Sequence, residues 1–502
     1  MLTKDKIAFA ILSGVLLFLA FSPNDQSYFA YIAFVPILIA IDELTPKEAF
    51  ILGSIMGFVF CAGHIYWIYI FNILALPAML IVFAIYFGVT FFIYKYIADR
   101  LFFITTFLFP AVLVSIEFLR SSGYFGFPWG VLGYSQYNFT ILIQLAEITG
   151  VFGISFLVAL ANTTIAFLFL SKFTFNRILI EGVAVLIIFF IVFLYGYDTQ
   201  KKFSEIQEYI NVAMLQPNFD LYEDYWINRN KRFKILYELC LRAAYEKPEI
   251  IVFPESVIPE YIIEYDVKTN KHYFINQEWY NFFKNIFNKY SGYILLNTNF
   301  EKKQNEYYNS AFLINSNLEI LKRYDKIHLV PFGETLPLIK KFFLMKWIAK
   351  LLGTFDYTAG TEFTLFEIEK GKFATIICFE DVFGELTRRF VKQGANFLIN
   401  LTNDGWSKSA AASYQHNSLA VFRAIENRVS LFRCTNTGFT TVIDLKGNIK
   451  KEIPIQKSEI LIESELVNKK IKTFYTRYGD IFANFVLLFT LLILIIAVFK
   501  PQ

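Results

Sequence analysis

The sequence predicts an integral membrane α-helical bundle that carries one exported α/β domain. Of the 502 residues, 56% are hydrophobic and 19% aromatic, while only 18% are charged, where about 25% charged is ordinary for a soluble protein. Long apolar runs lie before residue 198 and after residue 481, and between them short apolar runs alternate with amphipathic stretches. A single soluble core could not hide this surplus, because a solvated surface needs more polar residues.

The apolar runs predict about eight transmembrane helices, since a hydrocarbon layer of about 30 Å needs about 20 apolar residues. They lie near residues 7–22, 28–41, 50–71, 74–94, 101–118, 149–170, 178–197 and 481–499. The first run follows two lysines and could instead be a signal peptide, but Phe21-Ser22-Pro23 offers no small-x-small cleavage site. We therefore favour an anchored helix.

The distribution of Lys and Arg predicts the topology. One set of alternate loops contains Lys4, Lys6, Lys47, Lys95, Arg100, Lys172, Arg177 and Lys500. The other set, before the exported region, contains only Arg120. Because positively charged loops stay cytoplasmic, we expect both termini inside the cell and the region after residue 198 outside.

The region 199–475 predicts a domain of alternating strands and helices. The expected strands are 210–215, 250–253, 293–296, 373–377, 397–401, 430–433 and 440–444. The expected helices are 224–245, 277–290, 382–393 and 410–426. This alternation indicates an α/β domain, so we divide the chain into residues 1–198, 199–475 and a last helix within 476–502.

Charge and cysteine spacing exclude several classes of function. The 47 basic and 43 acidic residues give a net charge of +4, far from the basic balance of a nucleic-acid-binding protein. The four cysteines are widely spaced and form no C-x-x-C pair, which disfavours a disulfide scaffold and a cysteine zinc site. H-E-x-x-H, P-loop and G-x-G-x-x-G motifs are missing. We expect neither a metal nor a cofactor.

Three chemically useful side chains follow predicted strands or lie in a Pro-bounded segment. Glu255 follows the run 250–254, Lys326 lies in the polar segment 323–334, and Cys378 follows the run 373–377. Singly, each has an ordinary explanation as a turn carboxylate, a surface ammonium or a small buried hydrophobe. As a set, they offer a base, a cation and a nucleophile.

These segments resemble the nitrilase superfamily. The motifs are Pro-Glu-Ser (254–256), Asp-Lys-x-His-Leu-Val-Pro-Phe-Gly-Glu (325–334) and Cys-Phe-Glu (378–380). With seven helices before them and one after, the chain is similar to the apolipoprotein N-acyltransferase family, bacterial enzymes that complete lipoprotein maturation. Further similar segments are 117–120, 126–135, 403–406, 415–416, 423–428, 433, 436–438 and 477–480.

The resemblance implies a four-layer αββα sandwich with Glu255 as general base, Lys326 as the cation that stabilises the oxyanion, and Cys378 as nucleophile. It also implies supporting roles near these three residues for Glu334, Glu380 and Phe379, and substrate contacts for Trp226, Trp129 and Trp406. Three positions depart from the family pattern. Phe379 stands where many members have Tyr, and Gly405 and Ser407 flank Trp406 where Ala and Phe are usual.

The activity that the resemblance implies is acyl transfer through a cysteine thioester. A membrane phospholipid would donate the acyl chain, and the N-terminal amine of a diacylglyceryl-modified apolipoprotein would accept it. We expect a monomer in the bacterial inner membrane with its catalytic domain on the periplasmic face. The alternatives are a membrane-tethered amidase that uses water as acceptor and an inert lipoprotein-binding or transport protein. About eight helices exceed what a tethered hydrolase needs, and an inert protein would not require Glu, Lys and Cys together.

Other polar residues have structural explanations. We expect His328 and His416 to be structural histidines, and His64 to face the interior of the bundle. Glu117 and Arg120 share a helical face, which favours pairing with each other over contact with a lipid headgroup.

Three further features are judged by their spacing or by the motifs around them. Cys240 and Cys434 are expected in the core. Residues 336–352 interleave lysines with Phe and Trp, which favours an arm that dips into the leaflet over an ordinary surface helix.

Overall fold

The chain forms two compact units, seen in a computed structural model. The helical unit comprises residues 1–203 and 477–502, and the sheet unit comprises residues 204–476. The structure describes residues 2–71, 73–101, 105–170, 175–202, 208–266, 269, 271–303, 306–335, 356–470 and 472–500. The predicted amphipathic arm at 336–352 lies outside the described residues.

The helical unit contains helices of very unequal length. Its α-helices are α1 (Lys4–Ala20), α2 (Val35–Ala40), α3 (Pro46–His64), α4 (Ile68–Phe71), α5 (Ala75–Ala98), α6 (Thr105–Ser121), α7 (Ala146–Thr149), α8 (Val151–Phe167), α9 (Phe175–Thr199) and α16 (Ile481–Phe499). Within the part of this unit that the structure describes, three 3-10 helices lie between them at Ser27–Tyr31, Leu132–Gln136 and Leu142–Leu145. Four helical segments among the described residues are long and apolar enough to cross a membrane: α3, α5, Leu179–Thr199 of α9, and α16.

The run predicted to span at residues 28–41 is not one continuous helix. It forms a 3-10 turn followed by the six-residue helix α2, which has Pro36 in its first turn. The amide of Phe34 donates to the Asn162 side chain at 2.8 Å, and the amide of Ile37 donates to Ser13 Oγ at 3.0 Å. These side chains satisfy backbone groups that a continuous helix would have bonded internally, so the break costs little in a buried place.

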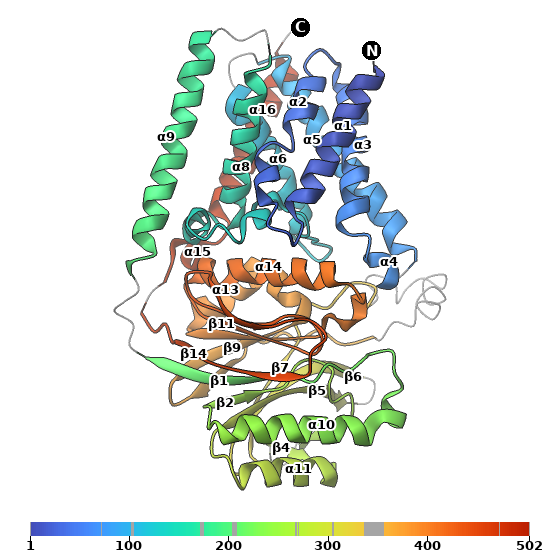
Figure 1. Cartoon of the computed structure of the whole chain (residues 1–502), viewed down its shortest axis with the longest axis vertical. Coiled ribbons are helices and arrows are strands. Elements are labelled where there is room, and N and C mark those ends of the chain that lie inside the picture. The colour runs from blue at the N-terminus through green and yellow to red at the C-terminus, as the bar shows by residue number, and fades with distance from the viewer. Residues whose placement is uncertain are drawn as a thin grey trace. The chain divides into compact units, whose positions relative to one another are not determined.

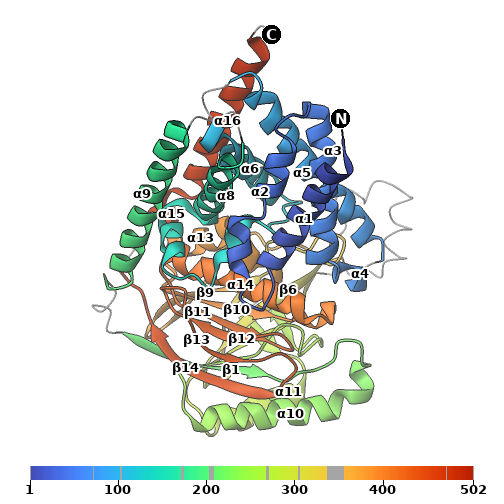
Figure 2. The same cartoon turned by 45° about the horizontal axis from the view of Figure 1, so that its top comes forward.

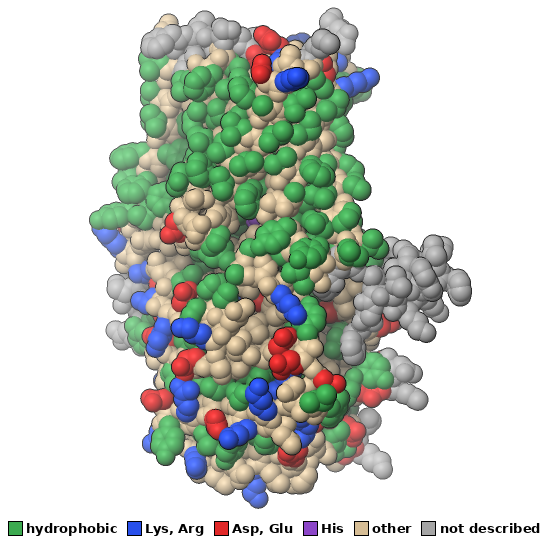
Figure 3. All heavy atoms as spheres, turned by 45° about the vertical axis from the view of Figure 1, so that its right-hand side comes forward, with side chains coloured by type: hydrophobic (Ala, Val, Ile, Leu, Met, Phe, Trp, Pro, Cys, Tyr) green, Lys and Arg blue, Asp and Glu red, His purple; other side chains and the backbone are tan. Residues whose placement is uncertain are grey.

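Close packing of α3 against α5 depends on glycine. A Cβ added at Gly53 would lie 2.6 Å from the carbonyl oxygen of Phe87, and one at Gly57 would lie 2.3 Å from that of Phe83. Small residues permit such close approach of apolar helices, and the two helices run side by side in Figures 1 and 2. On the face drawn in Figure 3, hydrophobic side chains cover the helical unit, whereas acidic and basic side chains are spread over the sheet unit.

The sheet unit is built on two six-stranded sheets. The first has the order β14-β1-β2-β5-β6-β7, and the second has the order β13-β12-β11-β10-β9-β8. The strands of the first are β1 (Tyr209–Gln216), β2 (Ile250–Val252), β5 (Tyr293–Lys303), β6 (Glu306–Ile314), β7 (Ile320–Asp325) and β14 (Glu459–Leu466). Those of the second are β8 (Leu365–Ile368), β9 (Gly371–Ile377), β10 (Phe397–Thr402), β11 (Leu431–Thr435), β12 (Thr440–Ile443) and β13 (Ile449–Ile453). A separate hairpin joins β3 (Ile263–Asp266) to β4 (Lys271–Phe274).

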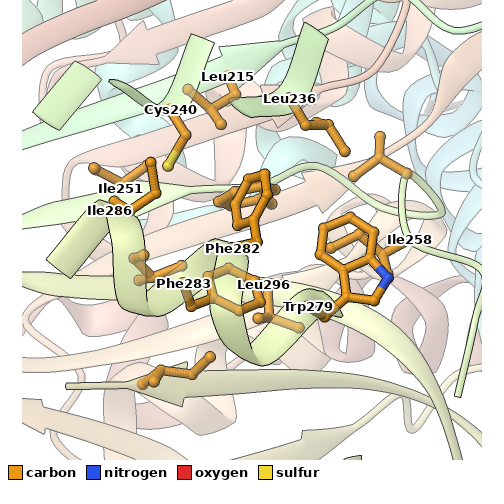
Figure 4. Packing of buried hydrophobic residues seen from close by; sticks show 14 of the residues in the cluster. Leu215, Leu236, Cys240, Ile251, Ile258, Trp279, Phe282, Phe283, Ile286 and Leu296 are labelled. Atoms are coloured by element: carbon orange, nitrogen blue, oxygen red, sulfur yellow. The ribbon is translucent and has the colours of Figure 1, made fainter. Parts of the chain in front are cut away.

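Helices cover the outer faces of both sheets and complete four layers. Figure 1 shows α10 (Tyr225–Tyr245) and α11 (Gln277–Phe287) on one side, and α13 (Gly384–Gln393) and α14 (Ala410–Asn427) on the other. The short helix α15 (Phe474–Tyr478) follows the last strand. A core of buried residues joins the outer helices to the first sheet, and Figure 4 shows Cys240 lying in it among Leu215, Ile251 and Ile286. The expectation that Cys240 belongs to the core is confirmed.

Candidate active site

Three residues that follow strands converge on one buried place in the sheet unit. Glu255 follows β2, Lys326 follows β7, and Cys378 follows β9. The first two strands belong to one sheet and the third to the other, so the site lies where the two sheets meet. Glu255 is 5% exposed, Lys326 1% and Cys378 7%. In an ordinary surface loop these polar side chains would be solvated, whereas here the surrounding structure buries them almost completely.

Lys326 lies between two carboxylates. Its Nζ is 2.7 Å from Glu334 Oε1 and 3.4 Å from Glu255 Oε1. The Glu334 carboxylate also accepts a hydrogen bond from the amide of Val330 at 2.8 Å, which fixes it beside the lysine. Two carboxylates offset the cost of burying one ammonium group.

Asn309 joins the two carboxylates and was not anticipated from the sequence. Its Nδ2 donates to Glu255 Oε1 at 2.9 Å and to Glu334 Oε1 at 3.4 Å. It lies in β6, whose backbone carbonyl at this residue accepts a hydrogen bond from the amide of Lys326. One residue therefore sets the position of the lysine and of both its partners.

Cys378 lies on a strained turn. Its φ is +50°, a left-handed conformation that non-glycine residues seldom adopt and that is common where a strand delivers a nucleophile. The negative charge of Glu255 acts directly on the thiol, for which it is one of the causes of a raised pKa. A carboxylate is therefore in place to take the thiol proton.

The electrostatics favour a neutral thiol beside a carboxylate at rest. Burial, followed by the negative charge of Glu255, raises the pKa of Cys378 well above its usual value. Burial also raises the pKa of Glu255, with Lys326 opposing and Glu334 adding to the increase. Burial alone would lower the pKa of Lys326, but Glu255 and Glu334 outweigh it and hold that pKa well above the usual value. The site thus combines a permanent cation with a carboxylate that binds a proton more readily than usual.

Glu380 ties the segment around Lys326 to the turn at Cys378. Its Oε1 accepts hydrogen bonds from the amides of Ile327 at 2.7 Å and His328 at 3.0 Å, and its Oε2 accepts one from the amide of Ile377 at 2.7 Å. The hydroxyl of Tyr324 donates to the same carboxylate at 2.8 Å. Burial raises the pKa of Glu380 to about 7. Glu380 therefore connects the backbone that follows β7 to the backbone at the end of β9.

Phe379 and His328 form part of an aromatic group beside the turn. The His328 ring centroid lies 3.9 Å from that of Phe383 and 6.0 Å from that of Phe379. Burial lowers the pKa of His328 to about 4, so this imidazole is neutral at physiological pH and packs as an aromatic ring.

The three tryptophans of interest have different environments. Trp226, at the start of α10, is 70% exposed and meets Tyr225 edge to face. Trp406 lies in a 3-10 turn at Asp404–Ser407, and its carbonyl accepts a hydrogen bond from the Tyr222 hydroxyl at 2.9 Å. Trp129 belongs to the helical unit, is 2% exposed, and has its ring centroid 6.0 Å from that of Trp67. Of the three, Trp226 presents the most surface to a ligand.

Several side chains that the sequence marked as structural have firm partners. His416 lies 2.7 Å from Asp381 and 2.8 Å from Asp404. Cys434 is fully buried, and its Sγ donates to the carbonyl of Leu215 at 3.3 Å. His64 is 1% exposed and stacks on Phe60.

The expected pairing of Glu117 with Arg120 is wrong. Glu117 Oε1 accepts a hydrogen bond from the amide of Leu132 at 2.8 Å, and the Arg120 guanidinium donates to the carbonyls of Phe127 and Trp129. Both side chains hold the loop that follows α6, because its irregular backbone needs partners that a helix would supply internally.

Two family models match separate stretches of the chain. Residues 13–164 match the model of the apolipoprotein N-acyltransferase N-terminal domain, and residues 211–470 match that of the carbon-nitrogen hydrolases. The apolipoprotein N-acyltransferase of Geobacter metallireducens is 34% identical over 94% of this chain and 92% of its own. Apolipoprotein N-acyltransferase 1 of Treponema denticola is 32% identical over 95% of each chain. A crystal structure from Saccharomyces cerevisiae, a member of branch 10 of the nitrilase superfamily, aligns with a TM-score of 0.37 and 18% identity over 52% of this chain and 90% of that one.

Proposed function

The chain belongs to the apolipoprotein N-acyltransferase family, and we propose that it moves a fatty acyl chain from a membrane phospholipid to the N-terminal amine of a diacylglyceryl-modified apolipoprotein. The observation that carries this proposal is the burial of the Cys378 thiol beside the charge of Glu255, whose carboxylate lies 3.4 Å from the Lys326 ammonium. A nucleophile, a base and a cation gathered in one buried site are the groups that acyl transfer requires.

In the first step, Glu255 takes the thiol proton and Cys378 Sγ attacks the ester carbonyl carbon of the phospholipid. The Lys326 ammonium stabilises the oxyanion that forms. When the tetrahedral intermediate collapses, the C–O bond breaks, the lysophospholipid leaves with the proton returned by Glu255, and a thioester remains on Cys378.

In the second step, the α-amine of the modified apolipoprotein cysteine attacks the thioester carbonyl. Glu255 accepts a proton from this amine, the C–S bond breaks, and the proton returns to the Cys378 thiolate. The product is an amide, and the enzyme is restored. Dividing the exchange of ester for amide between two steps lets one nucleophile serve both lipids.

The apolar helices support a location in the membrane. We place the chain in the bacterial inner membrane as a monomer with about eight crossings, both termini in the cytoplasm, and the sheet unit on the periplasmic face. The four long apolar helical segments support the location in a membrane, and the excess of Lys and Arg in alternate loops supports the orientation.

The direct test is mass spectrometry of the intact purified protein after incubation with phospholipid. We expect an added acyl mass on Cys378, which is lost in Cys378→Ala and is released by an apolipoprotein acceptor. Cys434→Ala is the matched control, because Cys434 also lies in a buried strand of the sheet unit but hydrogen-bonds to the backbone carbonyls of Leu215 and Val252. N-acylation of the acceptor at the normal rate by Cys378→Ala would refute the proposal.

An amidase would give a different result in the same experiment. With water as acceptor, the thioester would break down to free fatty acid, and the acceptor amine would remain unmodified. Measuring both products separates hydrolysis from transfer.

A further inference from the structure

Four buried charged side chains form a closed ring beneath the Cys378 turn. Arg433 Nη1 lies 2.9 Å from Asp381 Oδ2, and its Nη2 lies 3.0 Å from Asp404 Oδ2. His416 Nε2 lies 2.7 Å from Asp381 Oδ1, and its Nδ1 lies 2.8 Å from Asp404 Oδ1. Each of the four side chains is at most 2% exposed.

The geometry of the ring defines its protonation. Both nitrogens of His416 face carboxylate oxygens, so both carry protons and the ring is an imidazolium. Burial and the positive charge of Arg433 disfavour this charge, but Asp381 and Asp404 outweigh them and raise the pKa of His416 above its usual value. Two cations then balance two carboxylates, which is the condition for keeping buried charges without an uncompensated one.

Asn400 connects this ring to the nucleophile. It lies in β10, opposite Arg433 of β11 and Ile376 of β9 in the two parallel registers. Arg433 Nη1 donates to Asn400 Oδ1 at 2.7 Å, and Asn400 Nδ2 donates to the carbonyls of Ile376 at 3.2 Å and Cys378 at 3.4 Å. Asp381 also lies three residues after Cys378 in the same 3-10 turn, Cys378–Val382. The ring is therefore linked to the turn in two ways: Asp381 is part of the turn, and Asn400, which is bonded to Arg433, donates to the carbonyl of Cys378.

We infer that Asn400 and Arg433, held by Asp381, Asp404 and His416, are positioning residues that keep Cys378 in its strained conformation against Glu255. A left-handed φ persists only where the surroundings impose it, and the amide of Asn400 fixes the carbonyl of the strained residue itself. The proposed function does not assign a task to any of these side chains, although the inference rests on Cys378 being the nucleophile of that function.

The test compares Asn400→Leu with Asn396→Leu in the full-length protein. Asn396 precedes the same strand at its other end, where its side chain accepts from the Lys372 amide and donates to the Asn468 carbonyl. Both substitutions remove backbone contacts of one strand, but only Asn400→Leu touches the Cys378 turn. The first readout is the rate at which iodoacetamide alkylates Cys378 without lipid. The second is kcat and KM for acyl-enzyme formation from phospholipid.

We expect Asn400→Leu to slow alkylation and to lower kcat by at least about tenfold with KM unchanged, because a misplaced nucleophile costs on the order of 10²-fold. Asn396→Leu should leave both within about twofold of the unsubstituted protein. Equal alkylation rates and kcat values in the two variants would overturn the inference.

Arg433→Lys provides a second variant in case Asn400→Leu does not fold. It keeps the charge but loses the fork that reaches Asp381, Asp404 and Asn400 together. Its control is Arg428→Lys, at a buried arginine that donates to the carbonyl of Leu445. Slower alkylation in Arg433→Lys alone supports the inference, and equal rates refute it.

The two readouts also separate this inference from the proposed function. If the unsubstituted protein forms no acyl-enzyme while Asn400→Leu still slows alkylation, the proposed function fails and the positioning role stands. If acyl transfer occurs and the alkylation rate does not respond to Asn400→Leu, the positioning role fails alone.

Discussion

Lys326 and Glu334 form the shorter ion pair of the candidate site, with 2.7 Å between Nζ and Oε1. The proposed base, Glu255, lies farther from the same ammonium, at 3.4 Å. Glu334 therefore compensates much of the positive charge of Lys326. Its own negative charge raises the pKa of Glu255. A carboxylate whose proton affinity is raised in this way is a better base toward a thiol.

Replacing Glu334 with Gln tests this relationship. The loss of its charge should lower the pKa of Glu255, so the acidic limb of the pH–rate profile for acyl-enzyme formation should move to lower pH. The plateau rate should fall by at least about tenfold, because a weaker base removes the thiol proton less readily. Glu362→Gln, at an exposed position, is the control. A slower variant with an unmoved limb would mean that Glu334 acts in some other way.

Glu255, Lys326 and Cys378, which the structure brings together in the candidate site, could be proposed from the sequence because each follows or adjoins a recognisable local feature and the set resembles a known family. Glu255 and Cys378 follow apolar runs, and Lys326 lies in a dense polar motif. Predicted strands such as 210–215 and 397–401 lie within β1 and β10 for the same reason, since buried strands read as continuous apolar segments.

The residues that hold the site together were harder to predict. Asn309 and Asn400 are polar residues inside strands, and their roles depend on which strand lies beside them and in which register. Neither pairing can be read from local spacing. The break within residues 28–41 was hard to predict for the same reason. The backbone amides at the break donate to side chains of other helices, Ser13 and Asn162.

Glu380 predicts a pH dependence of stability. Burial raises its pKa in the folded protein to about 7, against about 4.3 in an unfolded chain. The folded state therefore holds this proton more tightly. The resulting stabilisation is complete below the unfolded pKa and is lost as pH rises through the folded one.

The comparison is between Glu380→Gln and the unsubstituted protein, unfolded by denaturant at pH 5 and pH 8. The free energy of unfolding of the unsubstituted protein, minus that of the variant, should be smaller at pH 8 by up to about 3 kcal/mol. Glu369→Gln, at an exposed position, should give a difference that hardly changes. A difference in the free energy of unfolding that grows between pH 5 and pH 8 would contradict a raised pKa of Glu380 in the folded protein.

Trp226 separates substrate contact from stability. Its side chain is 70% exposed, so Trp226→Ala should change the free energy of unfolding by less than about 0.5 kcal/mol. If the ring contacts a lipid substrate, as we propose, acyl transfer should still fall by at least about tenfold, since a buried aromatic contact contributes about 2 kcal/mol. Ile227→Ala is the matched control, at the next residue and 83% exposed. Equal transfer rates in the two variants would remove Trp226 from the substrate site.

The proposed topology can be tested with exposed cysteines introduced into the Cys378→Ala variant, because the other three native cysteines are buried and have no proposed reactivity. Tyr245→Cys places a thiol on the sheet unit at a position that is 78% exposed, and Lys47→Cys places one at an exposed position in the first turn of α3. A membrane-impermeant maleimide added to intact cells with a permeable outer membrane should label the first variant and not the second. Lys47→Cys should react only after the inner membrane is opened, which shows that its thiol is competent. If Lys47→Cys is labelled in intact cells and Tyr245→Cys is not, the orientation is the opposite of the proposed one. The predicted orientation rests on the retention of positively charged loops in the cytoplasm. That result would therefore show that the excess of Lys and Arg in alternate loops does not determine the orientation of this chain.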